Sequence, residues 1–161
     1  MTHNSQVQSR RVKHVMSKDV VYVDLADTVH EAINLMVENR VAALPVLDGR
    51  GHCVGMFSTS DLLEIAREVN EDLLLLDEIS SLSGGWLVEK LKQGLGESRI
   101  EELMTSGVET IDSEATVSHA ARELMRHHVH RLPVVDKSGR LLGIISTMDI
   151  VAALAEIAPA E

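Results

Sequence analysis

Two four-residue strings place a hydroxyl and a carboxylate three positions apart, Ser58-Thr59-Ser60-Asp61 and Ser146-Thr147-Met148-Asp149. If a helix begins at each string, its unpaired backbone N–H groups and its dipole attract a phosphate, and the aspartate suits a ribose diol. The same spacing also occurs in an ordinary helix cap, where the serine and the acid bind only the helix's own backbone. The residues alone leave both interpretations open.

A cationic pair, His130-Arg131, comes directly before Leu132-Pro133, whereas the matching place in the first half holds Ala42-Ala43. Arg131 offers a forked donor for phosphate and His130 a pH-sensitive one. A solvated strand edge is the alternative interpretation. Because the chain has a formal net charge of -10, an anionic ligand needs local cations of this kind.

Neither a metal site nor an enzyme is predicted. His119, His127, His128 and His130 suggest a metal, but they straddle a predicted helix end, where the helix dipole already favours histidine. Cys53 falls in an apolar run and is interpreted as a small buried residue. The chain lacks a phosphate-binding loop, a nucleophile elbow, a two-histidine metal helix and a carboxylate pair apart from the cap strings.

The elements that must position these residues are duplicated. A shift of 88 positions aligns residues 16–61 with residues 104–149 without a gap and gives 16 identities over 46 positions. The repeated strings include Leu44-Pro45-Val46 with Leu132-Pro133-Val134, and both serine–aspartate strings. An internal repeat of this quality indicates two copies of one structural unit.

Each copy predicts the order β-α-β-β-α. Thr28 and Glu31 have the spacing of a capping box ahead of an apolar stripe, and a glycine-containing turn separates two short apolar runs. In the first copy the segments are 20–23, 28–40, 44–47, 53–57 and a helix from Ser58. In the second they are 108–111, 116–128, 132–135, 141–145 and 147 to about 157. The fold class is therefore α/β (α+β).

A unit of this size cannot cover both faces of its sheet, so we expect the copies to pack with pseudo-twofold symmetry around a shared core. The expected division is a polar tail at 1–11, a first repeat at 12–66, a helical insert at 67–99, a second repeat at 100–157 and a tail at 158–161. Apolar residues in the insert need burial against the module or a second chain.

Composition and charge exclude several protein classes. The 161 residues are 45% hydrophobic and 25% charged, which is typical of a soluble globular protein. The acidic balance and 2% aromatic content disfavour nucleic-acid binding. The longest leucine run is Leu73 to Leu76, and the start of the chain is polar, so we expect neither a membrane span nor a signal peptide. With a single cysteine, the expected location is the cytoplasm.

The repeated Leu-Pro-Val-(Leu/Val)-Asp, the following x-x-Gly and the Gly-x-x-Ser-x-x-Asp string resemble the CBS domain, named after cystathionine β-synthase. The tandem arrangement, over about 12–66 and 100–154, is similar to a CBS pair, also called a Bateman module. Similar modules bind adenine nucleotides or related adenosyl ligands in clefts between the repeats and regulate an attached or associated protein.

The resemblance assigns roles to individual residues. It implies that Asp149 and Asp61 hold ribose hydroxyls, and that a phosphate lies toward Ser146, Thr147, Ser58 and Thr59. His130 and Arg131 match positions that contact phosphate in the gamma subunit of AMP-activated protein kinase. Backbone near Val20, Val21 and Val108 would line the adenine side, with Met104 as a neighbour. Glu109 departs from the expected small or apolar residue, which disfavours di- and triphosphates.

The function implied is that of a stand-alone regulatory module that binds AMP, ADP, ATP or S-adenosyl methionine, requires no cofactor, and signals by conformational change to a separate partner protein. The stronger site is expected in the second copy, where the cations lie. Similar modules associate through their helical faces, which implies a homodimer. The alternative is a ligand-independent dimerisation and interaction scaffold.

Overall fold

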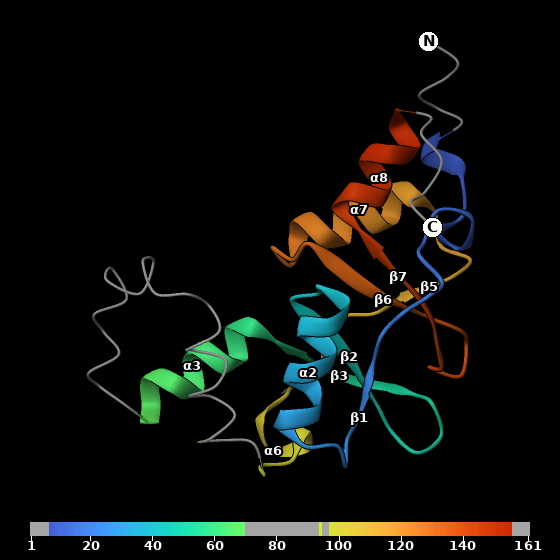
Figure 1. Cartoon of the computed structure of the whole chain (residues 1–161). Helices are drawn as coiled ribbons and strands as arrows, with labels where there is room; N and C mark the ends of the chain where they lie inside the picture. The colour runs from blue at the N-terminus through green and yellow to red at the C-terminus, as the bar shows by residue number, and fades with distance from the viewer. Residues whose placement is uncertain (1–6, 70–93, 95–96, 156–161) are drawn as a thin grey trace. The chain divides into compact units, whose positions relative to one another are not determined.

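The computed structural model describes residues 7–69, 94 and 97–155, and the chain divides into two compact units (Figure 1). Unit 1 comprises the described parts of 1–20, 50–53 and 108–161. Unit 2 comprises the described parts of 21–49 and 54–107. In the described part of the chain, no helix has both the length and the apolar character needed to cross a bilayer.

Unit 2 holds a four-stranded sheet with the order β1-β2-β3-β4. Strand β1 (Val23–Asp24) runs parallel to β2 (Ala43–Leu47), and β4 (Thr105–Ser106) runs antiparallel to β3 (Cys53–Ser58). Its helices are α2 (Val29–Asn39), α3 (Thr59–Val69) and α6 (Ile100–Leu103). The fully buried centre includes Val23, Val29, Ala32, Leu44, Val46, Phe57 and Ile100.

Helix α2 has the ends that its sequence predicts. Thr28 and Glu31 form a capping box, in which the Thr28 hydroxyl accepts from the Glu31 N–H and the Glu31 carboxylate accepts from the Thr28 N–H. At the other end, Arg40 adopts a left-handed conformation with φ 54° and closes the helix. The buried face consists of Val29, Ala32, Ile33 and Met36, at helical spacing.

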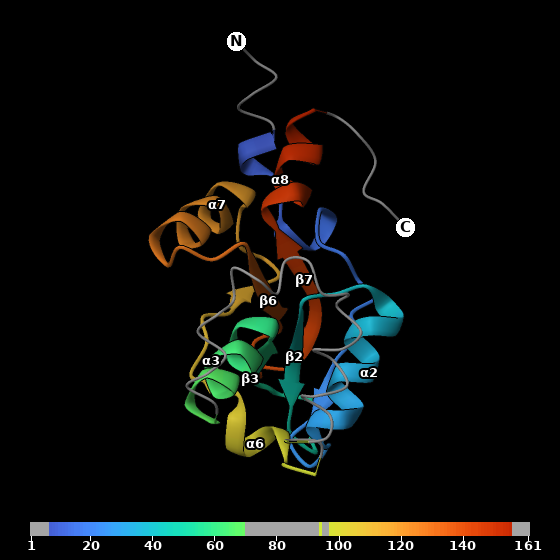
Figure 2. The same ribbon diagram turned by 60° about the vertical axis from the view of Figure 1, so that its left-hand side comes forward.

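Unit 1 repeats this plan with a three-stranded sheet of order β5-β6-β7. Strand β5 (Ile111–Asp112) is parallel to β6 (Arg131–Val135), which is antiparallel to β7 (Leu141–Ser146). Helices α7 (Val117–Arg126) and α8 (Thr147–Leu154) contact each other and pack on β6 and β7, respectively (Figures 1 and 2). A short 3-10 helix, η1 (Val12–His14), completes the unit.

The first residues of each repeat pack on the rest of the other repeat. Residues 12–20 of the first repeat lie in unit 1, where Val12 N donates to Ala115 O and Ser17 pairs with Ile144 through two backbone hydrogen bonds of 2.9 Å. Residues 100–107 of the second repeat lie in unit 2, where Ile100 N donates to Asp27 O. A shift of 88 positions maps the Val12 bond onto the Ile100 bond, so the exchange is reciprocal.

Two glycines allow this exchange at close range. A Cβ built on Gly143 would lie 2.6 Å from Ser17 O and 2.7 Å from Met16 Sδ. A Cβ on Gly55 would lie 2.6 Å from Thr105 O and 2.9 Å from the sulfur of Met104. Glycine is therefore required at both positions, because the backbone of a neighbouring segment lies too close to the strand to leave room for a side chain.

The predicted β-α-β-β-α order of both copies is confirmed, and several details differ. The first strands begin later than expected, at Val23 and Ile111, and β4 was not predicted. Within the described residues, the buried hydrophobic side chains form two clusters, one in each unit, where a single shared core was expected, although each cluster contains residues of both repeats. The predicted insert at 67–99 lies mostly outside the described residues, although α3 extends to Val69. The predicted tail at 158–161 also lies outside them.

Candidate functional site

The start of α8 is built by a reciprocal cap between Ser146 and Asp149. The Oδ2 atom of Asp149 accepts from the Ser146 N–H at 2.7 Å and from the Ser146 hydroxyl at 2.8 Å. In return, Ser146 Oγ accepts from the Asp149 N–H at 3.2 Å. Both side chains are half-buried. The cap interpretation of this string is therefore correct, but it uses only one of the two carboxylate oxygens.

The predicted cationic pair adjoins this helix start. Thr147 N donates to His130 O at 3.0 Å, and Arg131 is the register partner of Ser146 across β6 and β7. Arg131 is half-buried and His130 is exposed. The structure therefore brings Ser146, Thr147, Asp149, His130 and Arg131 to one end of the sheet in unit 1.

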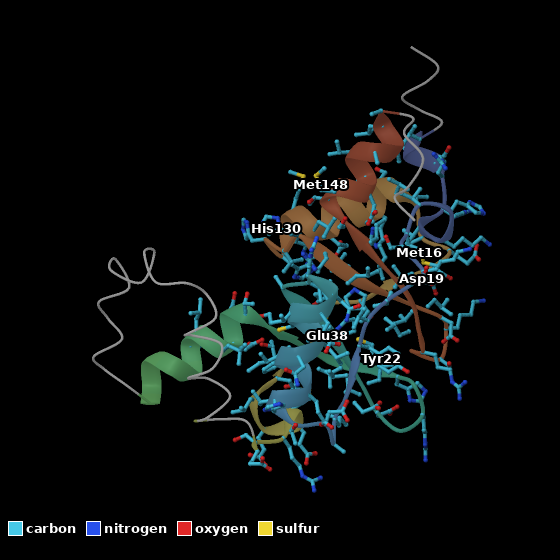
Figure 3. All side chains as sticks on the ribbon, viewed as in Figure 1. Met16, Asp19, Tyr22, Glu38, His130 and Met148 are labelled. Atoms are coloured by element: carbon cyan, nitrogen blue, oxygen red, sulfur yellow. The ribbon has the colours of Figure 1, made fainter. Side chains whose placement is uncertain are left out.

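A cavity of about 660 Å³ opens between α7 and α8 in the same unit. His130 and Thr147 line it, while Ser146, Asp149 and Arg131 are not among its lining residues. The rest of the lining is mainly apolar, contributed by Ala121, Leu124, Met125, His128, Val129, Ile150 and Val151. His130 lies on this helical side, as does Met148 (Figure 3). The cavity thus touches one edge of the predicted site.

The first copy carries the same cap at the start of α3. Asp61 Oδ2 accepts from the Ser58 N–H at 2.7 Å and from the Ser58 hydroxyl at 2.9 Å. Thr59 N donates to Ala42 O, the counterpart of the bond from Thr147 to His130. One contact is added here, because the Thr105 hydroxyl donates to Asp61 Oδ1 at 2.8 Å.

Thr105 creates a difference between the two copies that sequence reasoning missed. Its counterpart 88 residues earlier is Ser17, and among the described residues no side chain donates to Asp149 Oδ1. Asp149 therefore keeps one oxygen available to a ligand, whereas both oxygens of Asp61 already accept hydrogen bonds. The lack of an arginine at the matching position of the first copy points the same way, since Ala42 and Ala43 replace the cationic pair. The unexpected β4 strand places the threonine, so no short motif signals it.

The remaining predicted residues are divided between the units. Val20 and Val108 are half-buried and belong to unit 1. Val21 and Met104 belong to unit 2, where both pack against its core. The predicted set is therefore distributed over the two units.

Comparison with known proteins finds similarity over both repeats. A family model described as the CBS domain matches twice, at residues 12–68 and 100–156. An uncharacterized protein from Methanocaldococcus jannaschii, MJ1426, is 32% identical over 153 residues, with 89% of this chain and 90% of that protein covered.

Two solved structures illustrate the likeness in three dimensions. CBSX2 in complex with AMP has a TM-score of 0.69 and 28% identity, covering 91% of this chain and 96% of that chain. CBSX2 is a protein of Arabidopsis thaliana. The CBS domain of a membrane protein from Sphaerobacter thermophilus has a TM-score of 0.71 and 25% identity, covering 94% of this chain and 91% of that one.

Proposed function

This chain belongs to the CBS-domain family, and we propose that it is a regulatory module that binds an adenosyl ligand at the start of α8 and acts on a separate protein. The observation that carries the proposal is the arrangement around Asp149. One of its oxygens closes the helix cap and the other is available to a ribose hydroxyl. In the same first turn, the backbone N–H groups of Ser146, Thr147 and Asp149 are already paired, which leaves the N–H of Met148 and the positive end of the helix dipole to attract a phosphate.

Local charge supports a phosphate at this end of unit 1. The chain as a whole is acidic, with a formal net charge of -10, so a bound phosphate depends on nearby cations. Arg131, paired in register with Ser146, supplies a fixed positive charge, and His130 adds a second donor. The first copy lacks both, so we propose one strong site and one weak or empty site.

The preferred ligand class is an adenosine monophosphate. CBSX2, which is 28% identical to this chain, has been solved in complex with AMP. Glu109 lies just after Val108, and its carboxylate would repel the additional charge of ADP or ATP. S-adenosyl methionine, which carries no phosphate, would gain less from Arg131. Binding would shift the module between two conformations, and the size of the shift depends on how much more tightly the ligand binds one conformation than the other.

Thermal and chemical unfolding of the full chain, with and without a panel of nucleotides and S-adenosyl methionine, tests the proposal. AMP, ADP, ATP, S-adenosyl methionine and, as the base control, GMP would each be added in excess. A ligand present at about 100 times its Kd raises the free energy of unfolding by roughly 2.7 kcal/mol. We expect stabilisation by AMP and none by GMP. If no adenosyl compound changes the unfolding free energy, the binding proposal is wrong.

A second function, an interaction scaffold, is favoured by the exposed apolar side chains of α7 and α8. Met125 is 75% exposed, Met148 69%, and Val151 and Leu154 are 52% exposed each. We propose that a second copy of the chain covers this helical face, giving a homodimer. Sedimentation velocity should then show a dimer without ligand that Val151→Glu dissociates. The control is Leu142→Glu, which places the same charge on β7, and an unchanged mass for Val151→Glu would reject this dimer.

The proposed role is regulatory and not catalytic, and the proposed location is the cytoplasm, as the sequence predicts. The regulated protein would be a separate chain that recognises the ligand-bound conformation. Affinity capture with the full chain, compared with and without AMP, would identify it, and a partner whose capture does not depend on the ligand would favour the scaffold function.

A further inference from the structure

Three side chains that can bind metal converge in unit 1, and none of them belongs to the cap of α8. Glu123 and His127 lie one turn apart at the end of α7, and Glu109 comes from the segment before β5. His127 Nε2 lies 3.2 Å from Glu123 Oε2 and 3.9 Å from Glu109 Oε2. One ligand atom from each of the three residues lies within 4.8 Å of the other two.

The cluster brings two carboxylates to a single ring nitrogen. One N–H can point at only one of the two acceptors, so a neutral or protonated His127 leaves the other carboxylate without a direct donor from this atom. Glu123 and His127 are largely shielded from solvent, at 20% and 28% exposure of their side chains, which makes the repulsion between acids costlier than it is in open water. A cation among the three atoms would satisfy all of them together.

The neighbouring cation does not take this place. Arg126 Nη1 lies 3.9 Å from Glu123 Oε1, whereas the pair with His127 uses the other oxygen, Oε2. The arginine side chain is 75% exposed, so its charge is well screened. Glu123 can therefore contact Arg126 with one oxygen and offer the other to an ion.

We propose that Glu109, Glu123 and His127 bind one divalent transition-metal ion, with Zn²⁺ as the best fit. Zinc takes imidazole nitrogen and carboxylate oxygen at roughly 2.0–2.2 Å in a tetrahedron, which requires ligand atoms about 3.3–3.5 Å apart. The observed 3.2 and 3.9 Å separations need only small side-chain adjustments. Mg²⁺ and Ca²⁺ prefer ligand sets made only of oxygen, so the imidazole selects against them. Water completes the coordination on the exposed side of Glu109.

The ion would join two separate parts of unit 1. Glu109 precedes β5, whereas Glu123 and His127 belong to the end of α7, which begins after β5. Metal binding to the folded state alone stabilises that state by mass action. The expected consequence is a rise in thermal stability on metal addition and restricted motion of the segment around Glu109. Asp149 and Ser146 take no part in this site, and Glu109 is the one residue that it shares with the proposed adenosyl site.

Isothermal titration calorimetry tests the proposal. The full chain is first stripped of metal with EDTA and then titrated with Zn²⁺, and the absorption spectrum of the Co²⁺ form reports the coordination geometry. We expect one Zn²⁺ per chain for the wild type, with affinity falling roughly tenfold or more in His127→Ala and in Glu123→Gln. Glu109→Gln changes an exposed side chain with little risk to folding, and it should weaken binding in the same way. Circular dichroism of each variant checks that the fold is kept.

The matched control is His119→Ala, which removes an exposed imidazole from the same helix without touching the cluster. Its affinity should equal that of the wild type. Arg126→Ala should bind Zn²⁺ at least as tightly as the wild type, because it removes a competing positive charge near Glu123. The proposal is overturned if the wild type binds no stoichiometric Zn²⁺, or if Glu109→Gln and His127→Ala both bind it as the wild type does.

Discussion

Thr105 donates a 2.8 Å hydrogen bond to Asp61 Oδ1, on the oxygen that the helix cap leaves unused. The two residues come from different copies of the duplicated sequence, and the exchange of leading segments brings them together in unit 2. In unit 1 the corresponding position is Ser17, and within the described residues Asp149 Oδ1 receives no such bond. This hydrogen bond therefore distinguishes two helix caps that are otherwise alike.

Removing that hydroxyl should make the first copy more receptive to ligand. Thr105→Val keeps a β-branched residue in β4 and frees Asp61 Oδ1. We expect calorimetry with AMP to show a second, weaker binding event that is absent from the wild type. Ser17→Ala, the matched change in unit 1, should leave the titration unaltered. A Thr105→Val titration identical to that of the wild type would mean that the hydroxyl does not close the first-copy site.

The repeated glycines should be sensitive to one added methyl group. Gly143→Ala would place Cβ 2.6 Å from Ser17 O, and Gly55→Ala would place it 2.6 Å from Thr105 O. Because backbone cannot yield as a flexible side chain does, each variant should lose about 1–3 kcal/mol in the free energy of unfolding.

Urea denaturation checks this glycine prediction, with Gly49→Ala as the control. A Cβ on Gly49 has no neighbour within 4 Å, so that variant should stay within about 0.5 kcal/mol of the wild type. Equal stabilities for Gly143→Ala and Gly49→Ala would contradict the close packing of Ser17 against β7.

The cap of α2 should contribute to acid sensitivity. The hydrogen bond from the Thr28 backbone N–H, and then that from the Thr28 hydroxyl, hold the pKa of Glu31 below its ordinary value. A carboxylate with a lowered pKa stabilises the fold above its unfolded pKa, and this stabilisation is lost as the pH falls through the lowered folded value. Glu31→Gln can keep the capping geometry but cannot titrate.

Unfolding free energies measured from pH 7 down to about pH 3 test this prediction, since the ordinary glutamate pKa is about 4.3. The wild type should lose more stability over that range than Glu31→Gln. Glu38→Gln, an exposed change on the same helix, should follow the wild type. If Glu31→Gln and the wild type have parallel pH profiles, the lowered pKa of Glu31 does not contribute to stability.

Local features of the fold were predictable because each depends on residues that lie close together in the sequence. The Thr28 and Glu31 spacing identified the start of α2, and Gly51 and Gly139, with φ of 84° and 88°, occupy the predicted hairpin turns. The capping roles of Ser146 and Asp149 also followed from their spacing. These signals depend on residues only a few positions apart, which is why both copies could be interpreted separately.

Long-range features could not be predicted in the same way. The hydrogen bond from Thr105 to Asp61 and the approach of Glu109 to His127 depend on which segments of the chain pack side by side. The sequence suggested only histidines as metal ligands, because nothing in the linear spacing places Glu109 next to an imidazole. A duplication predicts two equal units, and it does not reveal that their leading segments are exchanged.

The central claim is that the second copy holds the adenosyl ligand through the available oxygen of Asp149. Calorimetric titration of AMP into the wild type, Asp149→Asn and Asp61→Asn tests it most directly, because the two variants make the same change at matched caps. Losing one hydrogen bond to a charged group costs about 1.5–3 kcal/mol, so Asp149→Asn should weaken AMP binding roughly 10- to 100-fold while Asp61→Asn leaves it nearly unchanged. Equal affinities for Asp149→Asn and the wild type, or an equal loss in both variants, would contradict the claim.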